Sequence, residues 1–198
     1  MQQRVSLLCA IGALPNLGDG VSTSASAFGD DLSLALELAD LCDAVTLPAF
    51  ENRLFEVEYK SDRSEVTEAD REAERQLSGR LLAARPDHGL FGEEHGVTGN
   101  ELSPWQWIVD PIDGTSGFTR GIPIWATLIA LHHADDGLCV SVVSAPALGR
   151  RWWATKGGGA WADGRLCAVS GVDNIDDAQV NVTLNDGWRE LGHAEALI

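Results

Sequence analysis

The chain has 198 residues, 44% of them hydrophobic, which is enough for one well-buried domain and gives no reason to expect two. Its 14 basic and 30 acidic residues give a formal net charge of -16, which argues against a nucleic acid or a membrane surface as the main partner. An anionic ligand would need a cation to offset the repulsion from these negative charges. The cysteines form no C-x-x-C pair and no zinc-like spacing, so we expect reduced thiols in a cytoplasmic protein. They are Cys9, Cys42, Cys139 and Cys167.

The first residues differ from the rest of the chain. Arg4 precedes the apolar run VSLLCAIGAL, and an Ala25-Ser26-Ala27 triplet follows later, which together imitate a weak secretory signal. The basic region is thin, and the segment before the triplet is longer than a cleavage region usually is. We therefore expect residues 1–29 to be a disordered leader or the result of a misassigned start, and residues 30–198 to form one domain. No apolar run approaches the roughly 20 residues needed to span a bilayer.

Two amphipathic helices are predicted next. The first begins at Asp30 or Asp31, either of which could cap it, and is expected to end at Pro48. Its apolar face recurs at helical spacing and comprises Leu34, Leu38, Leu41 and Val45. The second helix is predicted over Thr67–Ala84. Its shared face comprises Ala69, Ala73, Leu77 and Leu81.

The other predicted elements are strands. They cover Phe55–Tyr59, Leu90–Phe91, Trp107–Val109, Ile124–Leu131, Leu138–Val143 and Arg151–Thr155. The segment Ala134–Gly137 joins two of the longer strands, and its Asp-Gly pair predicts a hairpin. Helices that come first, followed by an antiparallel run of strands, indicate a layered α+β fold.

Acidic residues stand at the ends of two of the short predicted strands. Glu93 and Glu94 follow Leu90–Phe91, and Asp110 follows Trp107–Val109. If these strands are neighbours, Glu93, Asp110 and the nearby Asp113 converge. Burying bare carboxylates is costly, so a cation is expected among them. Oxygen ligands of this kind suit Mg²⁺ or Mn²⁺.

The segment that follows gives the candidate site its local shape. Pro111 fixes its own φ and lacks a backbone donor, so Asp110–Asp113 is expected to turn sharply, with the Ile112 carbonyl pointing inward. A short helix is expected to run from Gly114-Thr115 through Phe118. Exposed N–H groups at its start would receive a phosphate.

Each of these features also has a purely structural explanation. Asp-Pro and Asp-Gly are ordinary turn pairs, and Glu93-Glu94 alone could be a solvated loop edge. Thr67–Asp70 has the form of a capping box, so spacing alone gives Asp70 either a local role or a role in the site. The tryptophans indicate packing, and no histidine is assigned any chemistry. The combination, rather than any single part, predicts a metal site.

The combined motifs resemble those of the inositol monophosphatase-like family of Mg²⁺-dependent phosphatases. The family has a G-E-E element followed by D-P-[IL]-D-G-T, and these are matched by Gly92–Glu94 and Asp110–Thr115. Lys60–Asp70, KSDRSEVTEAD, is similar to the family's lysine-to-V-T-x-x-D segment. The stretches WATLIAL and VVSAPALGRRWWATKGGGA look closest to the actinobacterial-type histidinol-phosphatase branch. The resemblance extends from about Asp30 to the C-terminus.

The resemblance implies a centre of two or three Mg²⁺ ions, and Mn²⁺ is left open because the same oxygens serve both metals. Glu93, Asp110 and the Ile112 carbonyl would hold one ion. Asp110 and Asp113 would share a second ion, and Asp70 would help to hold a third through water.

It also implies the roles of the catalytic residues. Thr115, oriented beside Glu93, would position the attacking water and help to deprotonate it, so Glu93, Thr115 and Asp70 form the implied catalytic set. Asp113 and the amides of Gly114 and Thr115 would bind the phosphate. Direct attack by water needs no phosphoenzyme and therefore no nucleophilic serine or cysteine.

For function, the resemblance implies hydrolysis of L-histidinol phosphate in histidine biosynthesis. An inositol-1-phosphate or general sugar-phosphate phosphatase is the first alternative, and a catalytically silent remnant or binding fragment is the second. The complete family has a layered αβαβα sugar-phosphatase-type fold with a later Trp-Asp segment, whereas no Trp-Asp dipeptide occurs here, so we expect only the N-terminal portion. The expected partner is a small phosphorylated metabolite, and a homodimer is left open.

Overall fold

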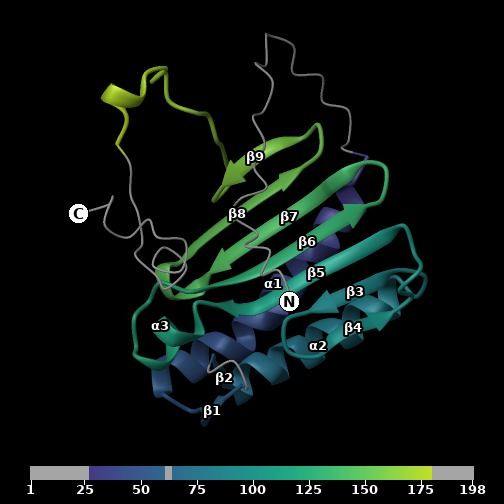
Figure 1. Cartoon of the computed structure of the whole chain (residues 1–198), viewed down its shortest axis with the longest axis vertical. Coiled ribbons are helices and arrows are strands. Elements are labelled where there is room, and N and C mark those ends of the chain that lie inside the picture. The colour runs from purple at the N-terminus through teal and green to yellow at the C-terminus, as the bar shows by residue number, and fades with distance from the viewer. Residues whose placement is uncertain (1–26, 61–63, 180–198) are drawn as a thin grey trace, which may run out of the picture.

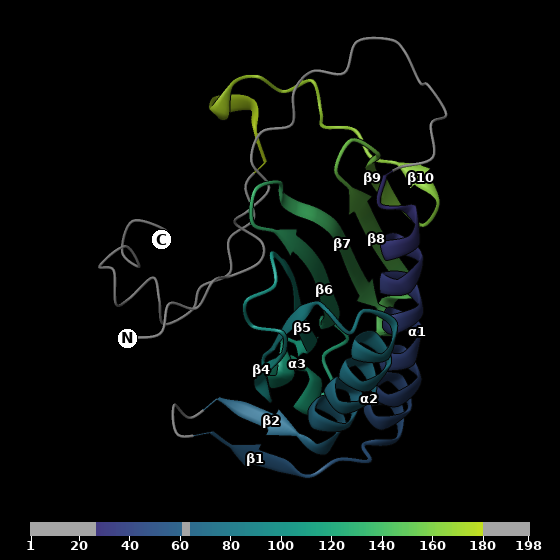
Figure 2. The ribbon, with the colours of Figure 1, turned by 90° about the vertical axis from the view of Figure 1, so that its right-hand side faces the viewer.

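Two long helices pack against one face of an eight-stranded sheet (Figure 1, Figure 2). The computed structural model of the protein describes residues 27–60 and 64–179, so most of the expected leader lies outside the described residues. The helices are α1 (Gly29–Asn52), α2 (Glu68–Ala84) and the short α3 (Thr115–Thr119). The strands are β1 (Val57–Tyr59), β2 (Glu65–Thr67), β3 (Gly89–Gly92), β4 (Gly96–Gly99), β5 (Trp105–Asp113), β6 (Ala126–His133), β7 (Gly137–Ala145), β8 (Arg150–Thr155), β9 (Gly159–Ala162) and β10 (Arg165–Leu166).

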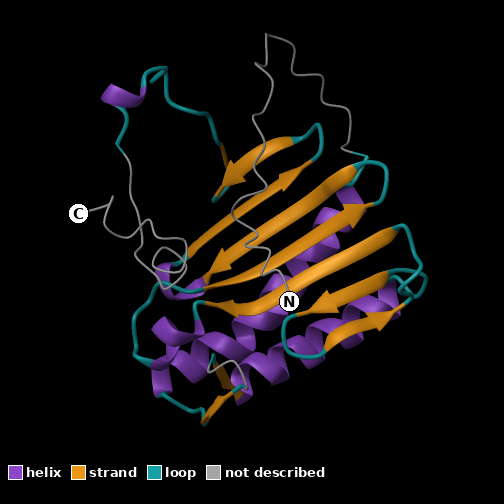
Figure 3. Cartoon of the chain, in the orientation of Figure 1, coloured by secondary structure: helices purple, strands orange, loops and turns teal. Residues whose placement is uncertain are grey.

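The large sheet has the order β10-β9-β8-β7-β6-β5-β3-β4, and β1 and β2 form a separate hairpin (Figure 3). Every neighbouring pair in the large sheet is antiparallel except β3 and β5, which are parallel. The predicted hairpin is present, with His133 opposite Gly137 at the end of β6 and β7. The layered α+β prediction is therefore confirmed. The short strands β2 and β4 were not predicted.

The first helix differs from its prediction at both ends. Its N-cap is Phe28 without a side-chain capping bond, so the predicted caps Asp30 and Asp31 lie inside the first turn, where Asp31 accepts two hydrogen bonds from Arg85 at 2.9 and 2.8 Å. Pro48 lies inside α1 rather than at its end. A proline removes one helical hydrogen bond, but the burial of Ala49 behind it supports the last turn of the helix.

The second helix was predicted correctly, including its capping box. Thr67 is the N-cap, its hydroxyl accepts from the Asp70 amide, and the Asp70 carboxylate accepts from the Thr67 amide at 2.8 Å. The predicted apolar face is buried against α1 and the sheet. This arrangement fixes the first turn of α2 and therefore the position of Asp70.

We expect Thr67→Ala to lower the free energy of unfolding by about 1 kcal/mol, since Thr67 is buried and its hydroxyl accepts from the Asp70 amide and donates to the Asp70 carboxylate. Thermal or urea unfolding would measure this loss. Thr67→Ser keeps the hydroxyl and serves as the matched variant. A Ser variant as unstable as the Ala variant would show that the methyl group, rather than the cap, matters at this position.

The core is divided into two parts. The larger cluster lies between the helices and the middle of the sheet, and Leu38, Leu77 and Trp107 are among its fully buried members. A smaller cluster contains Ile112 and Phe118, next to the acidic segment of β5. The second cluster therefore forms the apolar support of the candidate site.

Candidate active site

Two parallel strands bring the predicted acidic residues to the same end of the sheet, where the β3–β5 pairing stops. β3 and β5 are paired with Gly92 opposite Val109, so the residues that follow, Glu93 and Asp110, lie side by side where the pairing of these two strands ends. The Glu93 amide donates to the Val109 carbonyl at 3.2 Å. These strands are therefore neighbours, which was the condition for the convergence of their acidic residues.

The segment that begins at Asp110 does not turn sharply as predicted. It continues as strand, and Asp110 pairs with Leu128 while Asp113 pairs with Ala126. Since Asp110 and Asp113 are three positions apart on β5 and their partners are two apart on β6, one residue is extra and the strand bulges. Pro111 lies in this bulge, where a missing N–H is tolerated.

The bulge sets the directions of its polar groups. The Ile112 amide donates to Asp110 Oδ1 at 3.1 Å, and the Ile112 carbonyl accepts from the Thr115 hydroxyl at 3.0 Å. The Ile112 side chain is fully buried in the smaller apolar cluster. The predicted inward direction of the carbonyl agrees with its contact to Thr115, and a carbonyl oxygen has a second lone pair for another ligand.

The electrostatics of the site are dominated by carboxylates. Burial, followed by the charges of Glu93 and Asp113, raises the pKa of Asp110 to about 9. Burial and then Glu93 also raise the pKa of Asp113. These carboxyls therefore influence one another strongly, as expected from their convergence, and the site favours a proton or another cation.

Asp70 faces this group from the first turn of α2 and is completely buried. Its Oδ2 accepts from the amide and hydroxyl of Thr67, and its Oδ1 accepts from the Thr115 hydroxyl at 3.3 Å. Burial raises the pKa of Asp70, the bonds from Thr67 lower it, and the charge of Glu93 raises it further. Asp70 thus has the local capping role and also faces the candidate site.

The Thr115 hydroxyl contacts the Asp70 carboxylate, across from the first turn of α2. Its expected orientation beside Glu93 stays a prediction. The predicted short helix itself is present, with Gly114 as its N-cap at a φ of 95°, a conformation that favours glycine. A Cβ at Gly114 would also lie 3.1 Å from the Ile124 carbonyl.

A lysine in the site was part of a quoted segment but received no role. Lys60, at the end of β1, contacts Glu93 Oε1 at 3.3 Å and Glu94 Oε1 at 2.8 Å. Burial lowers the pKa of Lys60, but its bonds to the two glutamates outweigh this and raise it. The Glu94 side chain is only 4% exposed, so the solvated-edge interpretation of Glu93-Glu94 is wrong for Glu94. The available sequence signal was the place of Lys60 at the start of the quoted segment Lys60–Asp70.

The described residues do not form a finished metal cage. Among them, no three His, Cys, Asp or Glu side chains are arranged to hold an ion as they stand. The donor set nevertheless fits Mg²⁺, which keeps several waters and binds through one or two carboxylates plus a substrate phosphate. The raised pKa of Asp110 supports this fit, because a divalent cation would offset both the burial of the carboxylate and the repulsion from Glu93 and Asp113 that raise it.

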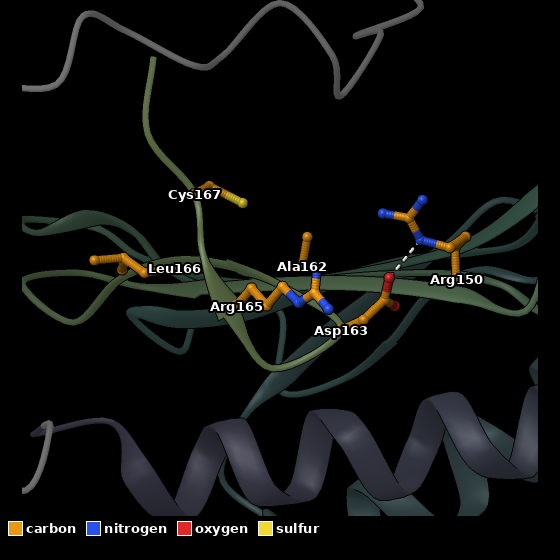
Figure 4. A pocket seen from close by; sticks show the side chains of 6 residues that line it. All are labelled: Arg150, Ala162, Asp163, Arg165, Leu166 and Cys167. Atoms are coloured by element: carbon orange, nitrogen blue, oxygen red, sulfur yellow. Dashed lines mark hydrogen bonds and ion pairs between the residues drawn. The ribbon is translucent and has the colours of Figure 1, made fainter. Parts of the chain in front are cut away.

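A separate hollow of about 430 Å³ lies at the opposite edge of the sheet, on β8, β9 and β10 (Figure 4). It is lined by Arg150, Ala162, Asp163, Arg165, Leu166 and Cys167. Arg150 and Asp163 form an ion pair across it. It contains none of the carboxylates that converge at β3 and β5, so we do not identify it with the candidate site.

The fold and this acidic edge define an α+β protein of the sugar-phosphatase type. The model of the inositol monophosphatase family matches residues 31–187, and the chain belongs to this family. It is 44% identical over 177 residues to the histidinol-phosphatase of Streptomyces coelicolor, which covers 85% of this chain and 66% of that protein. The corresponding identity to the histidinol-phosphatase of Mycobacterium tuberculosis is 45% over 175 residues, with the same coverage.

A solved structure with a similar fold is the extragenic suppressor protein suhB from Bartonella henselae. It superimposes with a TM-score of 0.68 and 30% identity, over 72% of this chain and 55% of that one. The chain thus spans just under two thirds of the histidinol-phosphatases that it matches and about half of this structural neighbour. In the part of the chain that the structure describes, no helix has the length and apolar character of a membrane span.

Proposed function

We propose that the protein is a Mg²⁺-dependent phosphomonoesterase that hydrolyses L-histidinol phosphate to L-histidinol and phosphate by direct attack of water. The observation that carries the reaction class is the group of mutually perturbed carboxyls where β3 and β5 end. The substrate is supported by the two histidinol-phosphatases that are 44% and 45% identical to the chain.

In this proposal, the metal ligands are those expected from the sequence. Glu93, Asp110 and the Ile112 carbonyl would hold one ion, Asp110 and Asp113 would share a second, and Asp70 would help to hold a third through water. When bound, Mg²⁺ supplies a water of lowered pKa, a clamp on the phosphate oxygens and stabilisation of the leaving alkoxide. Mn²⁺ remains an alternative because it accepts the same oxygen ligands.

The chain's own polar groups would orient the water and the phosphate. The Thr115 hydroxyl donates to Asp70 or the Ile112 carbonyl, so its lone pairs remain available to accept a hydrogen bond from a water. Glu93 would help to take the proton from that water. The Gly114 and Thr115 amides would contact phosphate oxygens. Because α3 has only 5 residues, its dipole adds little, and the cation must provide most of the binding energy for the anion.

A second candidate substrate class is inositol 1-phosphate or another sugar phosphate. The matched family takes its name from inositol monophosphatase, which favours this alternative. The reaction at phosphorus would be the same, and only the contacts to the leaving alcohol would differ. A catalytically silent or partner-binding chain is the third candidate, because no three His, Cys, Asp or Glu side chains among the described residues are arranged to hold an ion as they stand.

The proposal also includes the setting of the reaction. A place in histidine biosynthesis follows from the proposed substrate, and a cytoplasmic location is supported by the free thiols of Cys42, Cys139 and Cys167. The partner would be a small phosphorylated metabolite rather than a nucleic acid or a membrane. The proposal leaves a homodimer open.

Phosphate release by the purified chain tests this function. We expect release from L-histidinol phosphate with Mg²⁺, loss of release with chelator, and slower release from inositol 1-phosphate. A preference for inositol 1-phosphate would favour the second candidate. A folded chain that releases phosphate from neither substrate would contradict the proposal and favour the third candidate. Circular dichroism of the same sample would establish that the chain is folded.

A further inference from the structure

Glu74, in the middle of α2, is a buried carboxylate outside the predicted site. It is 1% exposed and lies one turn after Asp70 on the same face of the helix. Its Oε2 accepts from the Glu94 amide at 2.8 Å, and its Oε1 accepts from the His95 amide at 2.8 Å. The His95 Nδ1 also lies 3.0 Å from Oε1. Glu74 therefore binds two consecutive backbone amides of the turn that carries Glu93.

This contact leaves no room for a side chain at Gly92. A Cβ built at Gly92 would lie 2.0 Å from Glu74 Oε1. The turn is thus held on both sides of the Glu93 side chain, since the Glu93 amide bonds to β5 and the next two amides bond to α2. The glycine of the G-E-E element permits this close approach between backbone and carboxylate.

We propose that Glu74 is a positioning residue that holds the turn from Gly92 to His95 so that the Glu93 carboxylate faces Asp110 and Asp113. This inference rests on the proposed metal-dependent function. Glu74 does not reach the reacting atoms. It acts through hydrogen bonds to the backbone beside a proposed metal ligand, in the way that outer groups orient metal ligands in proteins.

A purely structural role would not require a carboxylate at this position. Glu74 lies in the same helical stripe as Leu77 and Leu81, where an apolar residue would pack without the desolvation cost of a charge. A carboxylate, however, offers two oxygens to two neighbouring N–H groups, and charge-assisted hydrogen bonds are stronger and more directional than neutral ones. The geometry thus explains why an acidic residue interrupts an apolar stripe.

The test compares Glu74→Gln with two control variants of the whole chain. A glutamine is nearly isosteric but turns an NH₂ group toward one of the two amides, so one hydrogen bond is lost and the turn is displaced. Glu72→Gln makes the same chemical change at a half-buried position of α2, where Glu72 pairs with Arg75 and Gln76. Leu77→Ala removes buried packing from α2 and reports the effect of lost stability alone.

The first readout is the dissociation constant of Mn²⁺ without substrate, followed by kcat and KM with Mn²⁺. We expect Glu74→Gln to weaken Mn²⁺ binding by about tenfold or more, with kcat lowered and KM for the substrate changed little. Both controls should bind Mn²⁺ within about twofold of wild type at a temperature where all the variants are folded. Mn²⁺ affinity of Glu74→Gln equal to wild type, or an equal loss in Leu77→Ala, would overturn the positioning role.

The two proposals can fail separately. A wild-type chain that binds Mn²⁺ but hydrolyses neither substrate would overturn the proposed reaction, while the Mn²⁺ affinities of the variants would still decide the role of Glu74. A wild-type chain that hydrolyses substrate, together with a fully active Glu74→Gln variant, would overturn the role of Glu74 alone. A folded wild-type chain without Mn²⁺ binding would overturn both.

Discussion

Replacing Asp110 with asparagine should abolish Mg²⁺-dependent phosphate release and at the same time make the metal-free protein more stable. The first effect follows because Asp110 is the carboxylate assigned to two ions. The second follows because burial, and then the charges of Glu93 and Asp113, raise the pKa of Asp110. We expect a gain of about 1–2 kcal/mol, since one pKa unit corresponds to about 1.4 kcal/mol and solvent screens much of the repulsion. Activity assays and thermal unfolding in chelator measure the two effects.

Asp136→Asn is the matched control for this variant. Asp136 lies in the hairpin between β6 and β7 and pairs with Lys156 at 2.9 Å. This hairpin lies at the Trp105 end of the β5–β6 pair, and Asp110 and Asp113 lie toward the other end. Its replacement should change neither activity nor the stabilisation of the protein by Mg²⁺. Retained turnover in Asp110→Asn would contradict the metal assignment. A lower melting temperature than wild type in chelator would contradict the repulsion among the carboxyls.

The pH dependence of the free energy of unfolding tests the raised pKa of Asp110 independently. Its pKa is about 9 in the folded chain, against about 3.9 for an unfolded aspartate, so between these values the folded state binds the extra proton. The stabilisation linked to Asp110 is therefore complete at low pH and is lost as pH rises toward about 9. In chelator, the stability difference between Asp110→Asn and wild type should grow with pH. A constant difference would contradict this linkage.

The long elements of the fold were predictable because their periodicity is strong. The helical repeat of Leu77 and Leu81 and the hairpin signal at Gly137 depend only on nearby residues. The strands β2 and β4 were missed because each has a single large apolar residue, a valine, among polar residues or glycines, so no apolar alternation shows. The extension of α1 beyond Pro48 depends on packing against residues far away in sequence, which local propensity cannot detect.

The candidate site was likewise predicted in part, through its residues but not through their contacts. Its acidic residues were predicted from two short motifs, and their meeting depended on the parallel pairing of β3 with β5. The contacts of Lys60 and Glu74 were not predicted, because they join residues 33 and 20 positions apart. Glu74 did leave one signal, which is a charged residue within an otherwise apolar helical stripe. The bulge at Pro111 was mistaken for a turn because proline is compatible with both.

Replacing Phe118 with alanine should remove the apolar support of the candidate site. Phe118 is fully buried, and its ring centroid lies 5.5 Å from that of Phe50, 5.0 Å from that of Phe55 and 5.0 Å from that of Trp125. Loss of this ring should cost about 3–5 kcal/mol. For a chain of this size, each kcal/mol lowers the melting temperature by roughly 2–4 °C. Thermal unfolding in chelator would measure the loss.

The effect of Phe118→Ala should also reach the site, because Phe118 belongs to α3 and packs in the same cluster as Ile112. Leu38→Ala in the larger cluster is the control, since it creates a cavity of comparable cost between α1 and the sheet. At a temperature where both variants are folded, we expect Phe118→Ala to weaken Mn²⁺ binding and Leu38→Ala to leave it unchanged. Equal Mn²⁺ affinities in the two variants would mean that the bulge and α3 keep their positions without the aromatic cluster, and that the β5–β6 pairing alone fixes the carboxylates.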